Sequence, residues 1–181
     1  MAEVLVQGLE EAGAHDVAHQ QRGLVDQAAE GLGHVVMFGL GGIYVEVFRD
    51  VSFKVFPERE IPSVFWYQRE FRYSLTYQKG EAPLIFVIAG TGSSFYSANM
   101  IFFQRIFYQA GFHVICLPSP THMNFITTAS ATSLPGNIIA DAVDLYRVMT
   151  MAWEQVKNRI KVSEFYLTGY SLGASEAAFV A

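Results

Sequence analysis

The chain is poor in cysteine, in basic residues and in long apolar runs, and each shortage excludes a class of protein. Its one cysteine, Cys116, cannot form an intramolecular disulfide or complete a zinc ribbon, and its apolar neighbours predict a buried small hydrophobe rather than a reactive thiol. No apolar run approaches the roughly 18 residues of a membrane span, so we expect none. No basic segment followed by an apolar one opens the chain, so no signal peptide is visible and we expect a cytoplasmic protein.

Basic side chains are fewer than acidic ones, 12 against 17, and the formal net charge is −5. This balance argues against nucleic acid as a partner, because proteins that bind nucleic acid carry an excess of positive charge on one face. Apolar residues make up 51% of the chain, which is enough for a buried core. A length of 181 residues suits one domain, or one domain with an appendage.

Charge is almost absent between Ala82 and Ala140, where Arg105 is the only Lys, Arg, Asp or Glu. Strands buried on both faces of a parallel sheet have such apolar runs, so a well-covered core explains part of the stretch. Its loops, however, carry Ser, Thr, Pro and Asn instead of charge. The alternative is therefore a weakly polar cleft for an uncharged or acyl substrate.

From residue 61 onward, strand patterns alternate with helix patterns. This succession predicts an α/β fold, with a mostly parallel sheet and helices on both faces. The expected strands are 71–77 (half-buried), 84–88, 112–117 and 164–168, and the expected helices are 97–110 and one that Asn137 caps. The second helix should bury one face, because its apolar positions recur every three or four residues: Ile138, Ala142, Leu145, Met149, Trp153 and Val156.

Residues 1–60 have a different pattern. An apolar run over 43–48 and an alternating run over 51–55 predict a β-hairpin with its turn at Arg49–Asp50. The prolines and charges around 58–62 are typical of a junction. We therefore expect an appendage over 1–60 that is not an independent domain, followed by the α/β part over 61–181.

The most informative motif is G-x-S-x-G over residues 169–173, with Ser171 at its centre. In this motif a sharp turn from strand to helix exposes the serine hydroxyl, which makes Ser171 the candidate nucleophile. Gly169 and Gly173 are expected because side chains there would collide with the strand or the helix. An apolar strand pattern precedes the motif, and small residues that would let a helix pack closely on the sheet follow it: Ala174, Ala177 and Ala178.

An acyl-transfer site also needs two backbone N–H groups aimed at the oxyanion. One should come from Leu172, the residue after the nucleophile. The other should come from the loop after the strand over 84–88, where the sequence reads Gly90-Thr91-Gly92. We expect Thr91 or Gly92 to supply it.

The segment 61–181 resembles the N-terminal part of an α/β-hydrolase. It is similar to a poorly characterised bacterial branch through the phrases FVIAGTG (86–92), YQAGFHV (108–114), DLYRVM (144–149) and FYLTGYSLGA (165–174). The resemblance implies a serine hydrolase, in which Ser171 attacks a small-molecule ester, thioester or amide and forms an acyl-enzyme. It implies no cofactor and no metal.

In that superfamily an acid and then a histidine follow the nucleophile. Ten residues follow Ser171 here, and all five histidines precede it: His15, His19, His34, His113 and His122. The resemblance therefore predicts a truncated and inactive form. The sheet edge left exposed would favour self-association.

We interpret the other titratable residues that could act with the motif as non-catalytic. We interpret His122 as a loop residue rather than a catalytic base. Asp141 and Asp144 should lie on the solvated face of their helix, with Asp144 near Arg147. Glu176 is too close to the serine in sequence to serve as the triad acid.

The glycines at 39–42 do not match the dinucleotide-binding pattern, because the third glycine would be Tyr44. The stretch 34–57 instead resembles a piece of the ATP-grasp domain of ADP-forming acyl-CoA synthetases. Nucleotide binding is not implied, because the second lobe and a lysine-bearing strand are absent, and Glu46 is interpreted as an exposed hairpin carboxylate. Two alternatives to the hydrolase remain: a fragment of such a synthetase, and a non-catalytic module with an α/β-hydrolase-like fold.

Overall fold

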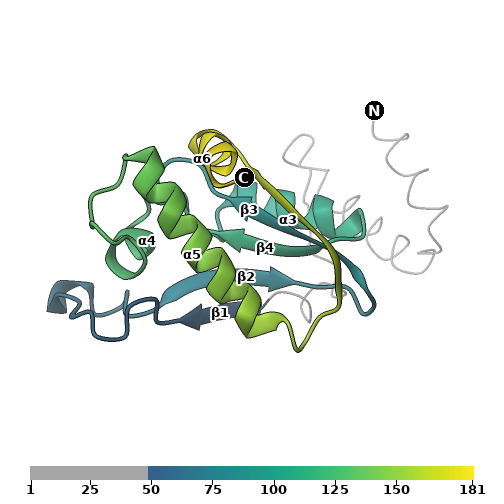
Figure 1. Cartoon of the computed structure of the whole chain (residues 1–181), viewed down its shortest axis with the longest axis horizontal. Helices are drawn as coiled ribbons and strands as arrows, with labels where there is room; N and C mark the ends of the chain where they lie inside the picture. Colours follow the sequence, from purple (N-terminus) through teal and green to yellow (C-terminus); the bar gives the residue numbers. More distant parts are fainter. Residues whose placement is uncertain (1–48) are drawn as a thin grey trace, which may run out of the picture. The chain divides into compact units, whose positions relative to one another are not determined.

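The computed structural model describes residues 49–181, which belong to one compact unit. Five strands form one sheet, in the order β1-β2-β4-β3-β5 (Figure 1). The strands are β1 (Arg49–Phe53), β2 (Phe71–Thr76), β3 (Ala82–Ile88), β4 (His113–Leu117) and β5 (Val162–Gly169). The helices are α3 (Ala98–Gln109), α4 (Met123–Thr128), α5 (Ile138–Val156) and α6 (Leu172–Val180), with a 3-10 turn, η1, at Ser63–Phe65.

Four of the five strands run in the same direction. β3 pairs in parallel with β4 and with β5, whereas β2 is antiparallel to both β1 and β4. β1 therefore runs the same way as β3, β4 and β5. The carboxyl ends of these four strands meet at one edge of the sheet, where ligand sites of α/β proteins usually form.

Helices cover both faces of the sheet, as predicted (Figure 1). Alternate side chains of β3 separate into two cores because successive residues of a strand point to opposite faces. Leu84, Phe86 and Ile88 pack in the core that contains residues of α5 and α6. Ile85 and Val87 pack in the second core, against α3.

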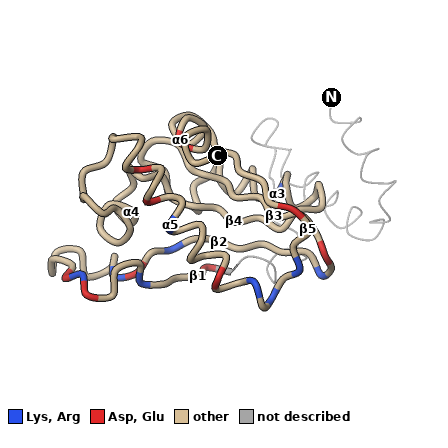
Figure 2. Tube along the Cα trace, viewed as in Figure 1, with Lys and Arg blue, Asp and Glu red and all other residues tan. Residues whose placement is uncertain are grey.

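The charge-poor stretch is well covered where it forms β3 and β4. Figure 2 shows few coloured segments along it. Every residue of β4 is buried, and Cys116 has its thiol pKa raised to about 12, chiefly by burial. In the loop that follows, Ser119 Oγ lies 2.8 Å from Thr121 Oγ1. The first interpretation of this stretch, a covered core, is thus confirmed for these two strands.

The hairpin prediction was wrong at its turn. Arg49 and Asp50 begin strand β1 and lie opposite Leu75 and Ser74 of β2, because β2 offers a long-range partner that local turn preference does not anticipate. The strand expected over 43–48 lies outside the described residues. The boundary at residue 60 stays a prediction.

Strand β2 is more deeply buried than its alternating pattern predicted. Five of its six residues are buried, including Ser74 and Thr76, which alternation placed toward solvent. Helix α3 covers that face, and Gln104 Nε2 donates to Ser74 Oγ at 3.0 Å and to Thr76 Oγ1 at 2.6 Å. The hydroxyl groups on this side of the strand therefore form hydrogen bonds with protein rather than with water.

Helix α5 begins after Asn137, whose Oδ1 accepts a hydrogen bond from Ala140 N at 3.3 Å, as predicted. The solvated positions predicted for Asp141 and Asp144 were wrong, since these residues are 1% and 2% exposed. Each carboxylate instead holds the loop before the helix, by accepting from Gly136 N at 2.8 Å and from Ala131 N at 2.7 Å respectively. The expected pair is confirmed: Arg147 Nη1 lies 2.5 Å from Asp144 Oδ1.

Among residues 49–181, no helix is both long and apolar enough to cross a membrane.

Candidate active site

Ser171 lies at a sharp turn between β5, which ends at Gly169, and α6, which begins at Leu172. Its backbone has φ 54° and ψ −127°, a conformation that a residue with a Cβ atom rarely adopts. Such strain persists only where the surrounding structure enforces it, and it is concentrated at functional sites. The side chain is exposed at the carboxyl edge of the sheet.

The two motif glycines are explained by backbone contacts. A Cβ atom on Gly169 would overlap the carbonyl group of Gly173, and one on Gly173 would overlap the carbonyl oxygens of Ile88 and Ala89. The turn can therefore close only with glycine at both positions.

The expected alanine-lined face of α6 was only partly correct. Ala177 is buried, but Ala174 and Ala178 are exposed. The helix buries Gly173, Glu176 and Ala177, because these positions share one face at spacings of three and four.

The loop after β3 lies directly beside the elbow. Ile88 pairs with Gly169 at the ends of β3 and β5, and a Cβ atom added to Gly90 would lie 3.1 Å from Ser171 Cβ. The structure therefore brings together the two segments that the sequence proposed for nucleophile and oxyanion donor.

The amide groups of this loop differ in availability. Gly92 N donates to Thr121 Oγ1 at 2.7 Å and is thus engaged. No hydrogen bond from Thr91 N to another residue of 49–181 is found. Leu172 is the first residue of α6, where a backbone N–H has no partner within the helix.

Tyr170 connects the elbow to the loop, a role that the motif does not reveal because its second position accepts any residue. Its ring stacks on Phe103 of α3, with centroids 5.7 Å apart. Burial alone would raise the pKa of its hydroxyl, but hydrogen bonds, the strongest from Ser93, lower it overall. Tyr170 thus packs between α3 and Gly90 of the loop, since a Cβ atom on Gly90 would lie 2.7 Å from Tyr170 Cε2.

The described histidines bond to other groups, and neither forms a hydrogen bond with Ser171 within residues 49–181. His113 is buried at the amino end of β4, where its Nδ1 accepts from Gln78 N at 3.0 Å and its Nε2 lies 2.9 Å from Lys161 O. His122 caps α4 by accepting from Asn124 N at 3.2 Å, and burial lowers its pKa. This agrees with the interpretation of His122 as a loop residue. His15, His19 and His34 lie outside the described residues.

Glu176 is a buried carboxyl group near the elbow. It is 1% exposed, and its Oε2 has no hydrogen-bond partner among residues 49–181. Burial, and secondly the carboxylate of Asp141, raise its pKa to about 7. Its spacing of three from Gly173 was the sequence signal that could have placed it on the buried face.

No protein-family model matches the chain. Its structure is similar to that of a dienelactone hydrolase from Anabaena variabilis, at 19% identity and a TM-score of 0.50, over 74% of this chain and 57% of that one. Est1E from Butyrivibrio proteoclasticus gives a TM-score of 0.47 at 15% identity, over 62% of this chain and 41% of Est1E. This chain thus spans about half the length of these structures.

A short sequence match points elsewhere. A segment of 28 residues, 16% of this chain, is 57% identical to the beta subunit of ADP-forming acetate–CoA ligase II from Pyrococcus furiosus, of which it covers 12%. The structural likeness concerns the fold: residues 49–181 form a five-stranded mixed sheet with helices, a partial fold of α/β-hydrolase type.

Proposed function

We propose that this chain is part of a serine hydrolase of α/β-hydrolase type that acts on a small-molecule ester, thioester or amide. The observation that carries the proposal is the backbone of Ser171, held at φ 54° beside the loop that contains Thr91. A strained serine at a strand-to-helix turn, next to amide groups that have no hydrogen-bond partner among residues 49–181, is the arrangement that acyl transfer requires.

In the proposed reaction, a base from outside residues 49–181 takes the hydroxyl proton as Ser171 Oγ attacks the carbonyl carbon, and the carbonyl π electrons move to its oxygen. The amides of Leu172 and Thr91 stabilise this oxyanion, whereas Gly92 N stays bound to Thr121. Collapse of the intermediate expels the leaving group, which receives that proton, and leaves an acyl-enzyme. Water then breaks the bond between the acyl group and Oγ, which releases the acid and restores the serine hydroxyl. No hydrogen bond connects Ser171 Oγ to a histidine within the described part of the chain, so we propose that the 181-residue chain by itself is inactive or nearly so.

Labelling with a fluorophosphonate probe, with and without added imidazole as an exogenous base, tests the nucleophile. We expect imidazole-dependent labelling of the chain that disappears in Ser171→Ala and persists in Ser175→Ala, because Ser175 is an exposed serine of the same helix. Labelling that survives in Ser171→Ala, or none even with imidazole, would overturn the assignment.

The inactivity is tested separately with a model ester. We expect hydrolysis barely above background, and turnover near about 1 per second, typical of an intact enzyme, would contradict it.

The 28-residue match supports one alternative, a fragment of an ADP-forming acyl-CoA synthetase. ATP should then raise the melting temperature of the chain, which the hydrolase proposal does not expect. A third alternative, a non-catalytic module of the same fold, predicts neither labelling nor a response to ATP.

A further inference from the structure

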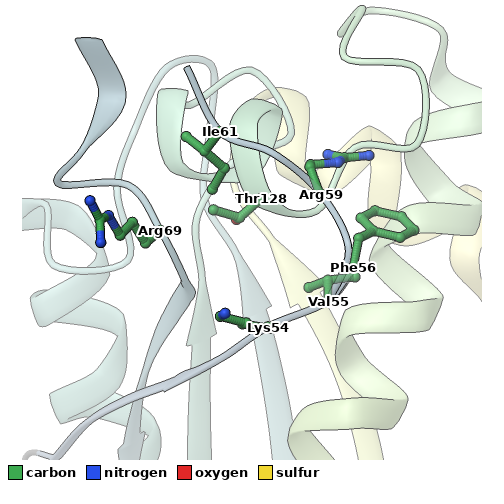
Figure 3. Close-up of a pocket in the computed structure, with 7 residues that line it drawn as sticks. All are labelled: Lys54, Val55, Phe56, Arg59, Ile61, Arg69 and Thr128. Carbon is green, nitrogen blue, oxygen red and sulfur yellow. The ribbon is translucent and has the colours of Figure 1, made fainter. Parts of the chain in front are cut away.

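A second candidate site lies in a pocket of about 240 Å³ beside the end of the outer strand β1 (Figure 3). The end of β1, the loop that leads to β2 and the end of α4 form its walls. Its lining residues are Lys54, Val55, Phe56, Arg59, Ile61, Arg69 and Thr128.

Positive charge dominates this pocket although the whole chain is acidic. Three of the seven lining residues are cationic and none is a carboxylate. Lys54, Arg59 and Arg69 form no salt bridge within residues 49–181, where the ion pairs found are Arg147–Asp144 and Lys157–Glu154. Like charges that line one pocket repel one another, so an anion bound among them would be stabilised.

Arg59 is held in place by its neighbours. Its guanidinium carbon lies 4.1 Å from the centre of the Phe56 ring, and its Nη1 donates to Thr127 O at 3.2 Å. Arg147 lies over the same ring at 5.2 Å. The pKa of Arg59 is lowered, first by burial, while the charge of Asp144 opposes the shift and that of Arg147 adds to it. A fixed arginine loses little entropy on binding. Its other N–H groups have no hydrogen-bond acceptor among residues 49–181, so they can meet an oxyanion.

No carboxylate of residues 49–181 lines the pocket, although the charge of Asp144 acts on Arg59. Glu58, Glu60 and Glu70 are close in sequence, but none lines it. Glu70 is engaged instead, since its Oε2 accepts from Ser52 Oγ at 2.6 Å. Thr128 adds no donor, because its hydroxyl donates to Asn124 O at 2.5 Å.

These features define the chemistry of a ligand. Arginine and lysine together are typical of phosphate recognition, the first by forked hydrogen bonds and the second as a point charge. Val55, Phe56 and Ile61 provide an apolar wall for a group attached to the phosphate. We propose that this pocket binds a phosphate dianion, either free or as the phosphate of a monoester.

The pocket is separate from the candidate active site. β1 and β5 are the two outer strands of the sheet and run in the same direction, so Lys54 and Ser171 follow strands that end at the same edge. Four strand spacings of about 4.8 Å place them roughly 19 Å apart. Phosphate binding can therefore be measured whether or not the hydrolase proposal holds.

The test is calorimetric titration of the full chain at low ionic strength, with inorganic phosphate and with phenyl phosphate. We expect saturable binding of at least one, weakened at least about tenfold in the double variant Lys54→Gln/Arg69→Gln. Both residues are exposed, so the variant should fold. The matched control is Lys79→Gln/Lys161→Gln, which removes the same charge from exposed positions at the opposite edge of the sheet and should bind as the wild type does.

The two ligands distinguish the two sources of phosphate. Tighter binding of phenyl phosphate supports a monoester that uses the apolar wall, and equal binding supports free phosphate. Absence of saturable binding of either ligand, or an equal loss in the control double variant, would overturn the proposal.

Discussion

Gly90 and Tyr170 lie in contact where β3 and β5 end. A Cβ atom on Gly90 would lie 2.7 Å from Tyr170 Cε2, closer than real Cβ contacts. Because Tyr170 also stacks on Phe103, its ring cannot move away freely.

We therefore expect Gly90→Ala to lower the free energy of unfolding by about 1–3 kcal/mol through overpacking. The measurement is urea denaturation. The same substitution in a Tyr170→Ala background should cost clearly less, because the obstructing ring is gone, and equal costs in both backgrounds would contradict the contact.

The strained backbone of Ser171 predicts an unusual order of stabilities. Glycine adopts positive φ without penalty, so Ser171→Gly should be more stable than Ser171→Ala by about 1–2 kcal/mol. Denaturation of the two variants under identical conditions measures the difference. A more stable alanine variant would show that the turn is not strained.

Gly173→Ala should be among the most damaging single substitutions. Its new methyl group would overlap the carbonyl oxygens at the end of β3, which are backbone atoms and cannot rotate aside. We expect a loss of about 3 kcal/mol or more, or failure to fold. Gly80→Ala is the matched control, because no atom lies within 4 Å of its added Cβ, and it should change stability by less than about 0.5 kcal/mol. Similar effects of the two substitutions would contradict the packing.

Because the pKa of Glu176 is raised, we expect the free energy of unfolding to decline as pH rises. Its pKa is about 7 in the folded chain, against an ordinary value of 4.5 that represents the unfolded chain, so the folded state binds the proton more tightly. The stabilisation of the folded state by this bound proton is thus fully present below pH 4.5 and is lost as pH rises through about 7.

Glu176→Gln, which is neutral and similar in shape, should be more stable than the wild type at pH 8 by about 1–3 kcal/mol, with a flatter pH profile. Thermal or urea unfolding between pH 5 and 8 provides the test. Glu81→Gln, at an exposed position, should leave the profile unchanged. If the stability of the Glu176→Gln variant still falls with pH like that of the wild type, the effect belongs to another group.

Self-association through β5 is expected, because β5 is an outer strand of the described sheet and carries exposed aromatic residues. Phe165 is 56% exposed and Tyr166 is 45% exposed. Phe165→Lys should shift the chain toward monomer in sedimentation or light scattering, since charge blocks edge pairing. Lys54→Gln, at the opposite side of the sheet, should leave association unchanged. A wild-type chain that is monomeric at all accessible concentrations would refute this prediction.

Much of the fold was readable from local patterns. The helix over 97–110, the helix capped by Asn137, the buried strand at 84–88 and the turn at Ser171 were each expected within a few residues of their observed bounds. These features depend on periodicity and on glycine placement, which act over neighbouring residues. The turn expected at Arg49–Asp50 failed because pairing with β2, some 25 residues away, overrode it.

The sequence by itself determined the alternation of strands and helices. It also determined the turn at Ser171, which cannot close without the two glycines that flank it. Only the tertiary structure decided that Asp141, Asp144 and Glu176 are buried and that Gly92 N is occupied by Thr121. It alone gathered Lys54, Arg59 and Arg69 around one pocket of an acidic chain. The physical reason is distance along the chain: a local pattern sets the conformation of a segment, whereas burial, hydrogen-bond competition and charge clustering depend on which distant segments the fold places beside it.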